Sequence, residues 1–273
     1  MQTCYRHSSV ETGVSCSSCG RPICPDCMTA TPVGMRCPEC AKQKTKVQTP
    51  RSIAGADPRV TYTLIALNVA VFVAQILGAG GATETPASRA YQEGVLFGPA
   101  VDAGEWWRLV TGGFLHDGPI HLLFNMVGVF FLGQLLEPRL GPVRFAALYF
   151  ASLLAGSLGV MLLSPLSPTL GASGAVFGLL GATFYLLLRQ GIDPMKTGIG
   201  PILILNILIT FAYRDAISVG GHLGGLAGGL VAAFLIAQAE DRRRAMLGTV
   251  ACVVLGVAAA VAAVAAAAAG TAG

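Results

Sequence analysis

The sequence predicts an all-α, polytopic membrane protein with a small cysteine-rich module near its N-terminus. Of its 273 residues, 53% are hydrophobic and only 12% are charged, which is too apolar for an ordinary soluble domain. Seven apolar stretches have the composition of membrane helices, whereas seven of the eight cysteines fall within the first 40 residues. The net charge of +4 suits a protein beside anionic lipids. It does not indicate nucleic-acid binding, because the charges lie in the loops.

Residues 1–41 form the predicted N-terminal module and read C-x2-H-x8-C-x2-C-x4-C-x2-C-x9-C-x2-C. A gap of two residues lets a tight turn bring both side chains of a pair to one metal ion, so four such pairs predict two tetrahedral zinc sites. The segment has too small a core to fold alone, and metal binding would supply its folding free energy. The predicted ligands are Cys4, His7, Cys16, Cys19, Cys24, Cys27, Cys37 and Cys40.

This module resembles the B-box and related cross-brace zinc modules. The resemblance implies alternating pairs, with the first and third pairs on one ion and the second and fourth on the other; spacing alone leaves the pairing open. A disulfide cluster or a redox switch is less favoured, because the module is expected in a reducing compartment. Since Arg6, Arg21 and Arg36 make no dense basic face, we expect a protein partner or substrate recruitment and no nucleic acid.

Membrane spans follow a basic linker over 42–59. Six are expected in 60–240, and a charged loop with a seventh in 241–273. Crossing a bilayer core of about 30 Å takes roughly 20 apolar residues per helix, and the fifth stretch is short by this measure. The predicted spans are Val60–Leu77, Pro119–Leu136, Val143–Leu163, Ala172–Leu188, Ile199–Tyr213, Ala216–Gln238 and Ala245–Ala269.

Lysine and arginine set the expected orientation in the cell membrane. They gather before the first span and after the second, fourth and sixth, while the opposite loops hold fewer. The positive-inside rule therefore predicts a cytoplasmic N-terminus and an extracytoplasmic C-terminus. No secretory signal is expected, because the first apolar run starts only near residue 60. The Ala- and Gly-rich last span hints at a bacterial source.

Four polar side chains stand out within the spans: His121 and Asn125 in the second, Ser173 in the fourth and His222 in the sixth. Such residues are costly in hydrocarbon and are candidate functional residues. A lone membrane serine usually bonds its own helix, and a lone histidine or asparagine often joins helices. However, the three spans run in the same direction. All four side chains are therefore expected at one shallow depth, on the order of 5–10 Å below the outer surface.

Stripes of small residues predict which spans touch. They are Gly174, Gly178 and Ala182 in the fourth span and Gly221, Gly225 and Gly229 in the sixth. Small residues at four-residue spacing let helix backbones approach closely, which a short serine side chain needs to reach an imidazole. Phe177 lies four residues after Ser173 and is expected to pack against the His222 ring.

These residues lie in motifs similar to the signature of rhomboid intramembrane serine proteases. The motifs are G-A-S-G at 171–174, H-L-L-F-N at 121–125, G-H-L-G-G-L-A-G-G at 221–229, W-R at 107–108 and G-Q-L-L-E-P-R-L-G at 133–141. The resemblance covers about residues 60–240. It implies a rhomboid-like six-helix bundle plus a seventh C-terminal transmembrane helix, with the zinc module outside the common core.

The expected chemistry is hydrolysis of a peptide bond in or near transmembrane segments of membrane proteins. Ser173 is the expected nucleophile and His222 its general base, a dyad because only loop-edge Asp117 and Asp215 lie at this depth. His121, Asn125 and the Ser173 backbone N–H are the expected oxyanion donors. Catalysis needs no cofactor. The residues expected to line the substrate cavity are Gly171, Gly174 and Phe177.

Four further residues are expected to have structural roles. Trp107 and Arg108 lie in a long outer loop, where tryptophan anchors to the membrane interface and the resemblance implies a scaffold in the outer leaflet. Glu137, with Arg139, is expected to brace the inner end of the second span.

The sequence disfavours two other functions. A catalytically silent rhomboid-like binding or quality-control factor is disfavoured, because such a protein is expected to have lost Ser173 or His222. A transporter or sensor predicts inverted repeats or a charge at the membrane midplane, and the sequence has neither.

Overall fold

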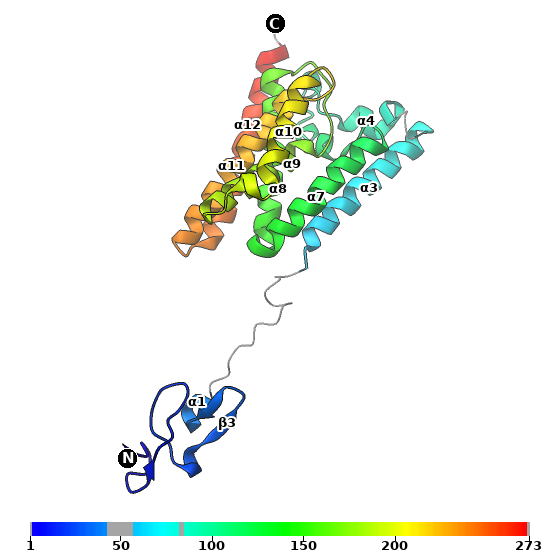
Figure 1. Cartoon of the computed structure of the whole chain (residues 1–273). Coiled ribbons are helices and arrows are strands. Elements are labelled where there is room, and N and C mark those ends of the chain that lie inside the picture. Colours follow the sequence, from blue (N-terminus) through cyan, green and yellow to red (C-terminus); the bar gives the residue numbers. More distant parts are fainter. Residues whose placement is uncertain (1, 43–56, 82–84, 272–273) are drawn as a thin grey trace. The chain divides into compact units, whose positions relative to one another are not determined.

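The computed structural model describes residues 2–42, 57–81 and 85–271. The chain forms two compact units, Met1–Ala54 and Gly55–Gly273 (Figure 1). Most of the predicted linker lies outside the described residues. The finer domain boundaries at residues 41, 59 and 240 stay predictions.

The N-terminal unit has little regular structure. Two antiparallel strand pairs, β1 with β2 and β3 with β4, frame it. Its buried core consists of six cysteines and Ile23, so the predicted ligand side chains occupy the place of a hydrophobic core. Its elements are β1 (Gln2–Thr3), β2 (Glu11–Thr12), η1 (Pro25–Cys27), β3 (Thr29–Thr31), β4 (Gly34–Arg36) and α1 (Pro38–Lys42).

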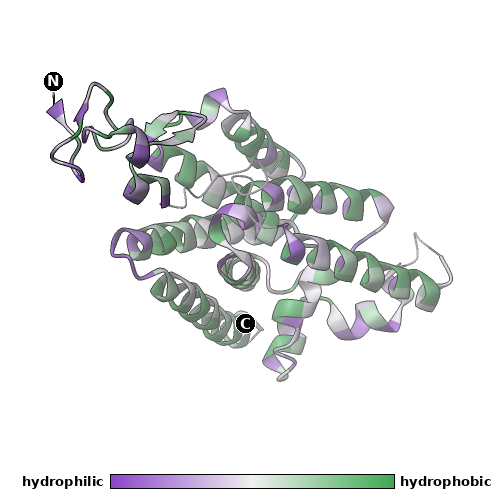
Figure 2. Cartoon of the chain, turned by 90° about the horizontal axis from the view of Figure 1, so that it is seen from below, coloured by the Kyte–Doolittle hydropathy of each residue, from purple (hydrophilic) through white to green (hydrophobic). Residues whose placement is uncertain are grey.

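The second unit is a bundle of apolar helices (Figures 1 and 2). Within the described residues, five of them are long and apolar enough to cross a membrane, and two apolar helices, α9 and α10, are shorter. The unit is thus the mostly helical, multi-pass fold that the composition predicts. Its long elements are α3 (Arg59–Ala79), α7 (Pro119–Leu140), α8 (Pro142–Leu163), α9 (Ser173–Arg189), α10 (Ile199–Ala212), α11 (Val219–Asp241) and α12 (Ala245–Thr271).

Some helix ends differ from the predicted spans for identifiable reasons. The sixth span was predicted from Ala216, but α11 begins at Val219 because the Ser218 hydroxyl accepts the Gly221 N–H and caps the helix. The second span was predicted to end at Leu136, whereas α7 continues through Pro138 to Leu140.

Helix α11 lies against α8, α9 and α12, and α3 packs on α7 (Figure 1). A Cβ on Gly225 would clash with the carbonyl oxygen of Gly174, and one on Gly229 with that of Gly178. The predicted close approach of the fourth and sixth spans is therefore confirmed. Helix α8 approaches α11 equally closely through Gly159, a position that the sequence did not single out.

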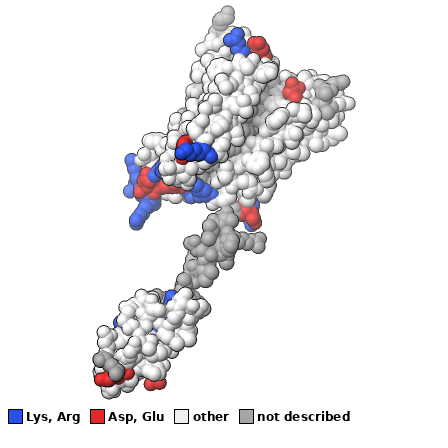
Figure 3. Space-filling model, viewed as in Figure 1, with Lys and Arg blue, Asp and Glu red and all other residues white. Residues whose placement is uncertain are grey.

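Charged side chains on the face drawn in Figure 3 gather mainly near the helix ends, and most of the helical unit is uncharged there. Arg144 forms an ion pair of 2.6 Å with Glu240 and joins α8 to α11. Arg189 pairs with Asp241 and joins α9 to the same end of α11.

The Glu137 carboxylate in α7 caps the start of α3. It is buried and accepts the backbone N–H groups of Val60 and Thr61, each at 2.8 Å, and the Thr61 hydroxyl at 2.7 Å. The two backbone N–H groups are donors that a helix N-terminus leaves unpaired. Glu137 thus braces the C-terminal end of α7 and does so against α3, whereas Arg139 is exposed.

We expect Glu137→Gln to destabilise the helical unit by about 1–3 kcal/mol, because the amide nitrogen would face backbone N–H groups that need an acceptor. Thermal unfolding in detergent measures this loss. Arg139→Gln, on the same turn but exposed, is the control and should unfold like the wild type; equal stability of both variants would contradict the capping role.

Residues 85–114, which lie between α3 and α7, are themselves folded and pack beside the site. Their elements are η2 (Thr85–Ala87), α4 (Arg89–Gly94), α5 (Gly98–Asp102), α6 (Arg108–Thr111) and η3 (Gly112–Phe114). Leu96 and Thr169 exchange both backbone hydrogen bonds, at 3.0 and 2.8 Å. The loop between α4 and α5 is therefore hydrogen-bonded to the segment around Thr169 that leads into α9.

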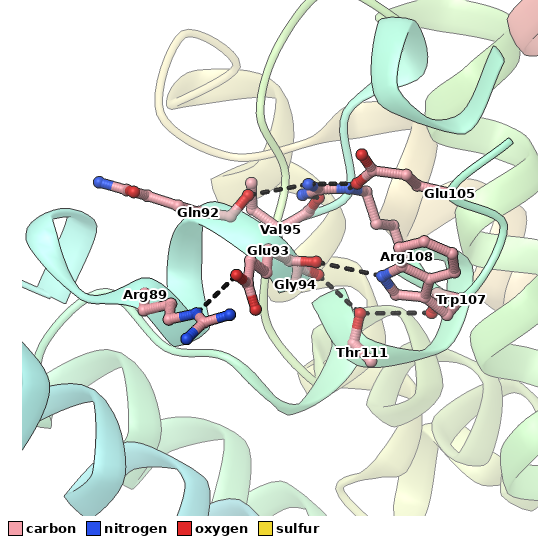
Figure 4. Close-up of polar contacts among 9 residues, drawn as sticks. All are labelled: Arg89, Gln92, Glu93, Gly94, Val95, Glu105, Trp107, Arg108 and Thr111. Carbon is pink, nitrogen blue, oxygen red and sulfur yellow. Dashed lines mark hydrogen bonds and ion pairs between the residues drawn. The ribbon is translucent and has the colours of Figure 1, made fainter. Parts of the chain in front are cut away.

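Arg108 holds this loop together (Figure 4). Its guanidinium is buried and donates to the carbonyl oxygens of Val95 at 2.9 Å and Gln92 at 2.8 Å, and to the Glu105 carboxylate at 2.6 Å. Trp107 is exposed, in keeping with its predicted interfacial role, and its indole N–H donates to the Glu93 carbonyl.

Candidate active site

Ser173 and His222 meet at the start of their helices. Ser173 is the first residue of α9 and His222 the fourth of α11. The Ser173 Oγ lies 2.8 Å from the His222 Nε2, within hydrogen-bond distance. The predicted juxtaposition of these two side chains is therefore present, brought about by the glycine contact between α9 and α11.

Phe177 fixes one face of the His222 ring. Their ring centroids lie 4.0 Å apart with an angle of 21° between the planes, a stacked arrangement. This confirms the packing that the four-residue spacing from Ser173 predicts. Both rings are buried, so the imidazole has little room to turn.

The second ring nitrogen of His222 has a partner that the sequence analysis did not identify. Nδ1 lies 2.7 Å from the hydroxyl of Thr210 in α10. Among the described residues, both ring nitrogens are hydrogen-bonded to hydroxyl groups and neither to a carboxylate.

His121 and Asn125 face the backbone just before Ser173. They lie one turn apart on α7, and the Asn125 Nδ2 donates to the His121 carbonyl at 2.9 Å. The Asp117 N–H lies 3.4 Å from the His121 Nδ1, which favours a proton on Nε2. A Cβ on Gly171 would lie 2.7 Å from that Nε2 and 3.8 Å from the Asn125 Nδ2. Gly171 also has a φ of +114°. Both the close contact with His121 and this backbone conformation therefore require glycine at this position.

One cavity connects these groups. It has a volume of 390 Å³, and Tyr91 and Asp117 line it beside the helices. All seven predicted catalytic, oxyanion and cavity residues line it: His121, Asn125, Gly171, Ser173, Gly174, Phe177 and His222. A hydroxyl, an imidazole that can accept its proton and two further donors therefore surround one space, which is the arrangement that acyl transfer requires.

Comparison with known proteins assigns the family. The model of the Rhomboid domain matches residues 103–239, a range that contains all seven of these predicted residues. The chain belongs to the rhomboid family. It is 36% identical over 197 residues to Rhomboid protease GluP of Bacillus subtilis (strain 168), covering 70% of this chain and 38% of GluP. It is 39% identical over 145 residues to Putative rhomboid protease YdcA of the same organism, covering 51% of this chain and 72% of YdcA.

A more distant similarity extends to a eukaryote. Rhomboid-like protease 3 of Toxoplasma gondii is 33% identical over 156 residues, which are 54% of this chain and 59% of that protein. The chain thus spans less than two thirds of the length of some of these relatives, GluP among them.

Gln75 is a buried residue of this rhomboid that supports the site and that the sequence analysis did not identify. Gln75 of α3 pairs with both backbone groups of His116, donating to its carbonyl at 3.3 Å and accepting its N–H at 3.0 Å. This contact fixes the turn that leads into α7 and so into His121. A glutamine inside an otherwise apolar span is the signal that could have identified it.

The predicted metal ligands lie outside the matched Rhomboid domain and form two clusters. In each, the ligand atoms all lie within 4.8 Å of one another, so each cluster could hold a metal ion. The grouping is the alternating one that the cross-brace resemblance implies. The clusters are Cys4, His7, Cys24 and Cys27, and Cys16, Cys19, Cys37 and Cys40.

The donor chemistry suits zinc. All eight cysteines lie in the described part of the chain and none forms a disulfide, so the thiols are free to act as ligands. The backbone N–H groups of Cys37, Ser18 and Cys19 lower the pKa of the Cys16 thiol to about 6, which favours its thiolate, whereas burial raises the pKa of Cys27 to about 11.

Proposed function

We propose that this rhomboid is an intramembrane serine protease that hydrolyses a peptide bond in or near the transmembrane segments of membrane proteins. The observation that carries the proposal is the 2.8 Å contact between the Ser173 Oγ and the His222 Nε2 inside the cavity. The printed names of its relatives, which include rhomboid proteases, support the same reaction class.

In the proposed reaction, the Ser173 Oγ attacks the scissile carbonyl carbon while its proton passes to the His222 Nε2. The tetrahedral intermediate collapses when His222 returns this proton to the departing amine, which leaves an acyl group on Ser173. A water molecule then attacks the acyl carbon and gives a proton to His222. The Ser173–acyl bond breaks, the proton returns to the Ser173 Oγ, and the carboxylic acid product leaves.

The developing oxyanion needs donors that are in place before the reaction. The His121 Nε2, the Asn125 Nδ2 and the Ser173 backbone N–H are proposed for this role. The two side-chain nitrogens face the backbone at Gly171, and a helix N-terminus such as that of α9 leaves its first N–H groups unpaired.

The proposed substrate is a membrane protein with a single span. A helix hides its amides in hydrogen bonds, so the span must unwind locally before Ser173 can reach a carbonyl, and small or helix-breaking residues make this easier. The distribution of lysine and arginine supports a cytoplasmic N-terminus and an extracytoplasmic C-terminus, which would place the cavity near the outer face.

Reconstitution tests this function. The purified chain and a fluorescently tagged single-span protein with a Gly-containing outer end are placed in the same liposomes, and mass spectrometry locates any cut. Wild type is expected to cut within or beside the span, and Ser173→Ala to give no product. Equal product from both, or a folded wild type that cuts no member of a panel of such spans, would overturn the proposal.

We also propose that the two N-terminal clusters each bind one structural zinc ion. Elemental analysis of the purified full chain should give about two zinc ions per molecule, and His7→Ala about one, because a lost ligand opens one tetrahedral site. Cys252→Ala, which removes a thiol far along the sequence in α12, should keep both. A wild type without zinc, or a His7→Ala variant that keeps two ions, would contradict this assignment.

A further inference from the structure

We propose that Thr210 is the positioning residue for His222. Its hydroxyl holds the imidazole in the tautomer in which Nε2 can take the Ser173 proton. The proposal rests on the proposed function and adds a third, uncharged member to the proposed dyad.

The argument starts from the single proton of the Thr210 hydroxyl. Its Oγ1 lies 2.7 Å from the backbone carbonyl of Asn206, which can only accept, and 2.7 Å from the His222 Nδ1. The hydroxyl must therefore donate to Asn206 and accept from Nδ1. Nδ1 thus carries the proton of the neutral ring, and Nε2 presents its lone pair.

The other contacts of the ring fit this assignment but do not create it. The bare Nε2 lies 2.8 Å from the Ser173 Oγ, which then donates to it, as a nucleophile must before it attacks. Phe177 stacks on the ring plane, and a stacked neighbour packs equally well against either tautomer. Thr210 is therefore the group among the described residues that distinguishes the two nitrogens.

The burial pattern of α10 supports a specific role. In this helix only Gly200 and Thr210 are buried, and the Thr210 side chain is turned inward to the ring. Thr183 of α9 makes the same bond to its own helix, donating to the Leu179 carbonyl at 2.8 Å, and it is also buried. The two threonines thus differ in the imidazole contact, which makes Thr183 a matched control.

Without the hydroxyl, the Nδ1–H would have no acceptor, and a buried unpaired donor is unfavourable. The ring would then favour the other tautomer, whose Nε2–H donates to the Ser173 Oγ and cannot accept its proton. We expect Thr210→Val to lower kcat at least about tenfold with KM unchanged, because Thr210 is not among the residues that line the cavity. Thr210→Ser should restore most of the rate, and Thr183→Val should behave as wild type.

Nitrogen-15 NMR of protein labelled at histidine reads the tautomer itself. In detergent micelles, the His222 signals are those that disappear in His222→Ala. Wild type and Thr210→Ser are expected to show a protonated Nδ1 and a bare Nε2, and Thr210→Val a shift toward the reverse. If Thr210→Val unfolds at a lower temperature, Thr210→Ser and Thr210→Ala are compared instead. These two variants differ only in the hydroxyl at position 210, and the same differences in kcat and in the His222 tautomer are expected between them.

Two results would overturn the proposal: a Thr210→Val variant with the kcat of Thr183→Val, or an unchanged His222 tautomer in that variant. Ser173→Ala separates this failure from a failure of the proposed function. If Ser173→Ala still cleaves, the protease assignment itself fails. If Ser173→Ala is inactive and Thr210→Val is fully active, only the positioning role fails.

Discussion

Ser173→Ala and His222→Ala are each expected to lower kcat by about 10⁶-fold, and the double variant is expected to lose no more than either alone. The reason is that a nucleophile and its base act as one unit: the hydroxyl is a weak nucleophile without a proton acceptor, and the imidazole has nothing to activate without the hydroxyl. Single-turnover cleavage of a reconstituted membrane substrate measures all three variants.

A second intramembrane serine provides the control for this series. Ser152 in α8 is buried, and its hydroxyl donates to the Leu148 carbonyl of its own helix at 2.8 Å. Ser152→Ala should therefore have the kcat of the wild type. This variant shows whether losing any hydroxyl within the membrane lowers the rate. Losses that multiply in the Ser173→Ala/His222→Ala double variant would show that the two residues act independently and would refute the dyad.

Asn125→Ala and His121→Ala are each expected to lower kcat by about 10²–10³-fold with little change in KM. Each substitution removes a donor aimed beside Gly171, where negative charge would develop only as the tetrahedral intermediate forms. A donor used in the transition state and not in the bound substrate affects kcat and leaves binding nearly unchanged. Initial rates over a range of substrate density in the liposome give both constants.

Val127→Ala is the matched control on the same helix, because its side chain is exposed on the outside of α7. It should be close to wild type in both constants. A raised KM with normal kcat in Asn125→Ala or His121→Ala would assign these residues to substrate binding and would remove them from the proposed oxyanion site.

The sequence carried enough information to predict the meeting of Ser173 and His222. Both lie near the start of spans that run in the same direction, and the glycine stripes that include Gly174 and Gly225 require those two helices to touch. Because the two side chains share a depth in the membrane and their helices are in contact, Ser173 and His222 are expected to lie close together. Phe177 followed from its spacing on the same helix face, which depends only on the geometry of an α-helix.

Thr210 could not be predicted in this way. A threonine in a membrane helix normally bonds a carbonyl one turn back, as Thr183 does, so its sequence context looks the same whether or not an imidazole is near. The distinction depends on the rotation of α10 about its own axis. That rotation follows from packing, and the apolar composition of this helix does not encode it.

The loop before α7 shows a similar limit. Trp107 is recognisable as an interfacial residue from its type and place, but the inward direction of Arg108 depends on the carbonyl groups of Gln92 and Val95. Those groups converge only when the loop has folded. The start of α11, by contrast, was predictable from the sequence, because Ser218 is a good N-cap residue before an apolar run.

Covalent labelling of Ser173 tests most directly whether His222 activates its hydroxyl. A fluorophosphonate forms a bond between phosphorus and an activated serine oxygen while fluoride departs, and peptide mass spectrometry locates the adduct. We expect one adduct, on Ser173, in the folded wild type and none in His222→Ala. A folded wild type that stays unlabelled, or an adduct that forms equally well when His222 is absent, would contradict a serine hydroxyl activated by this imidazole.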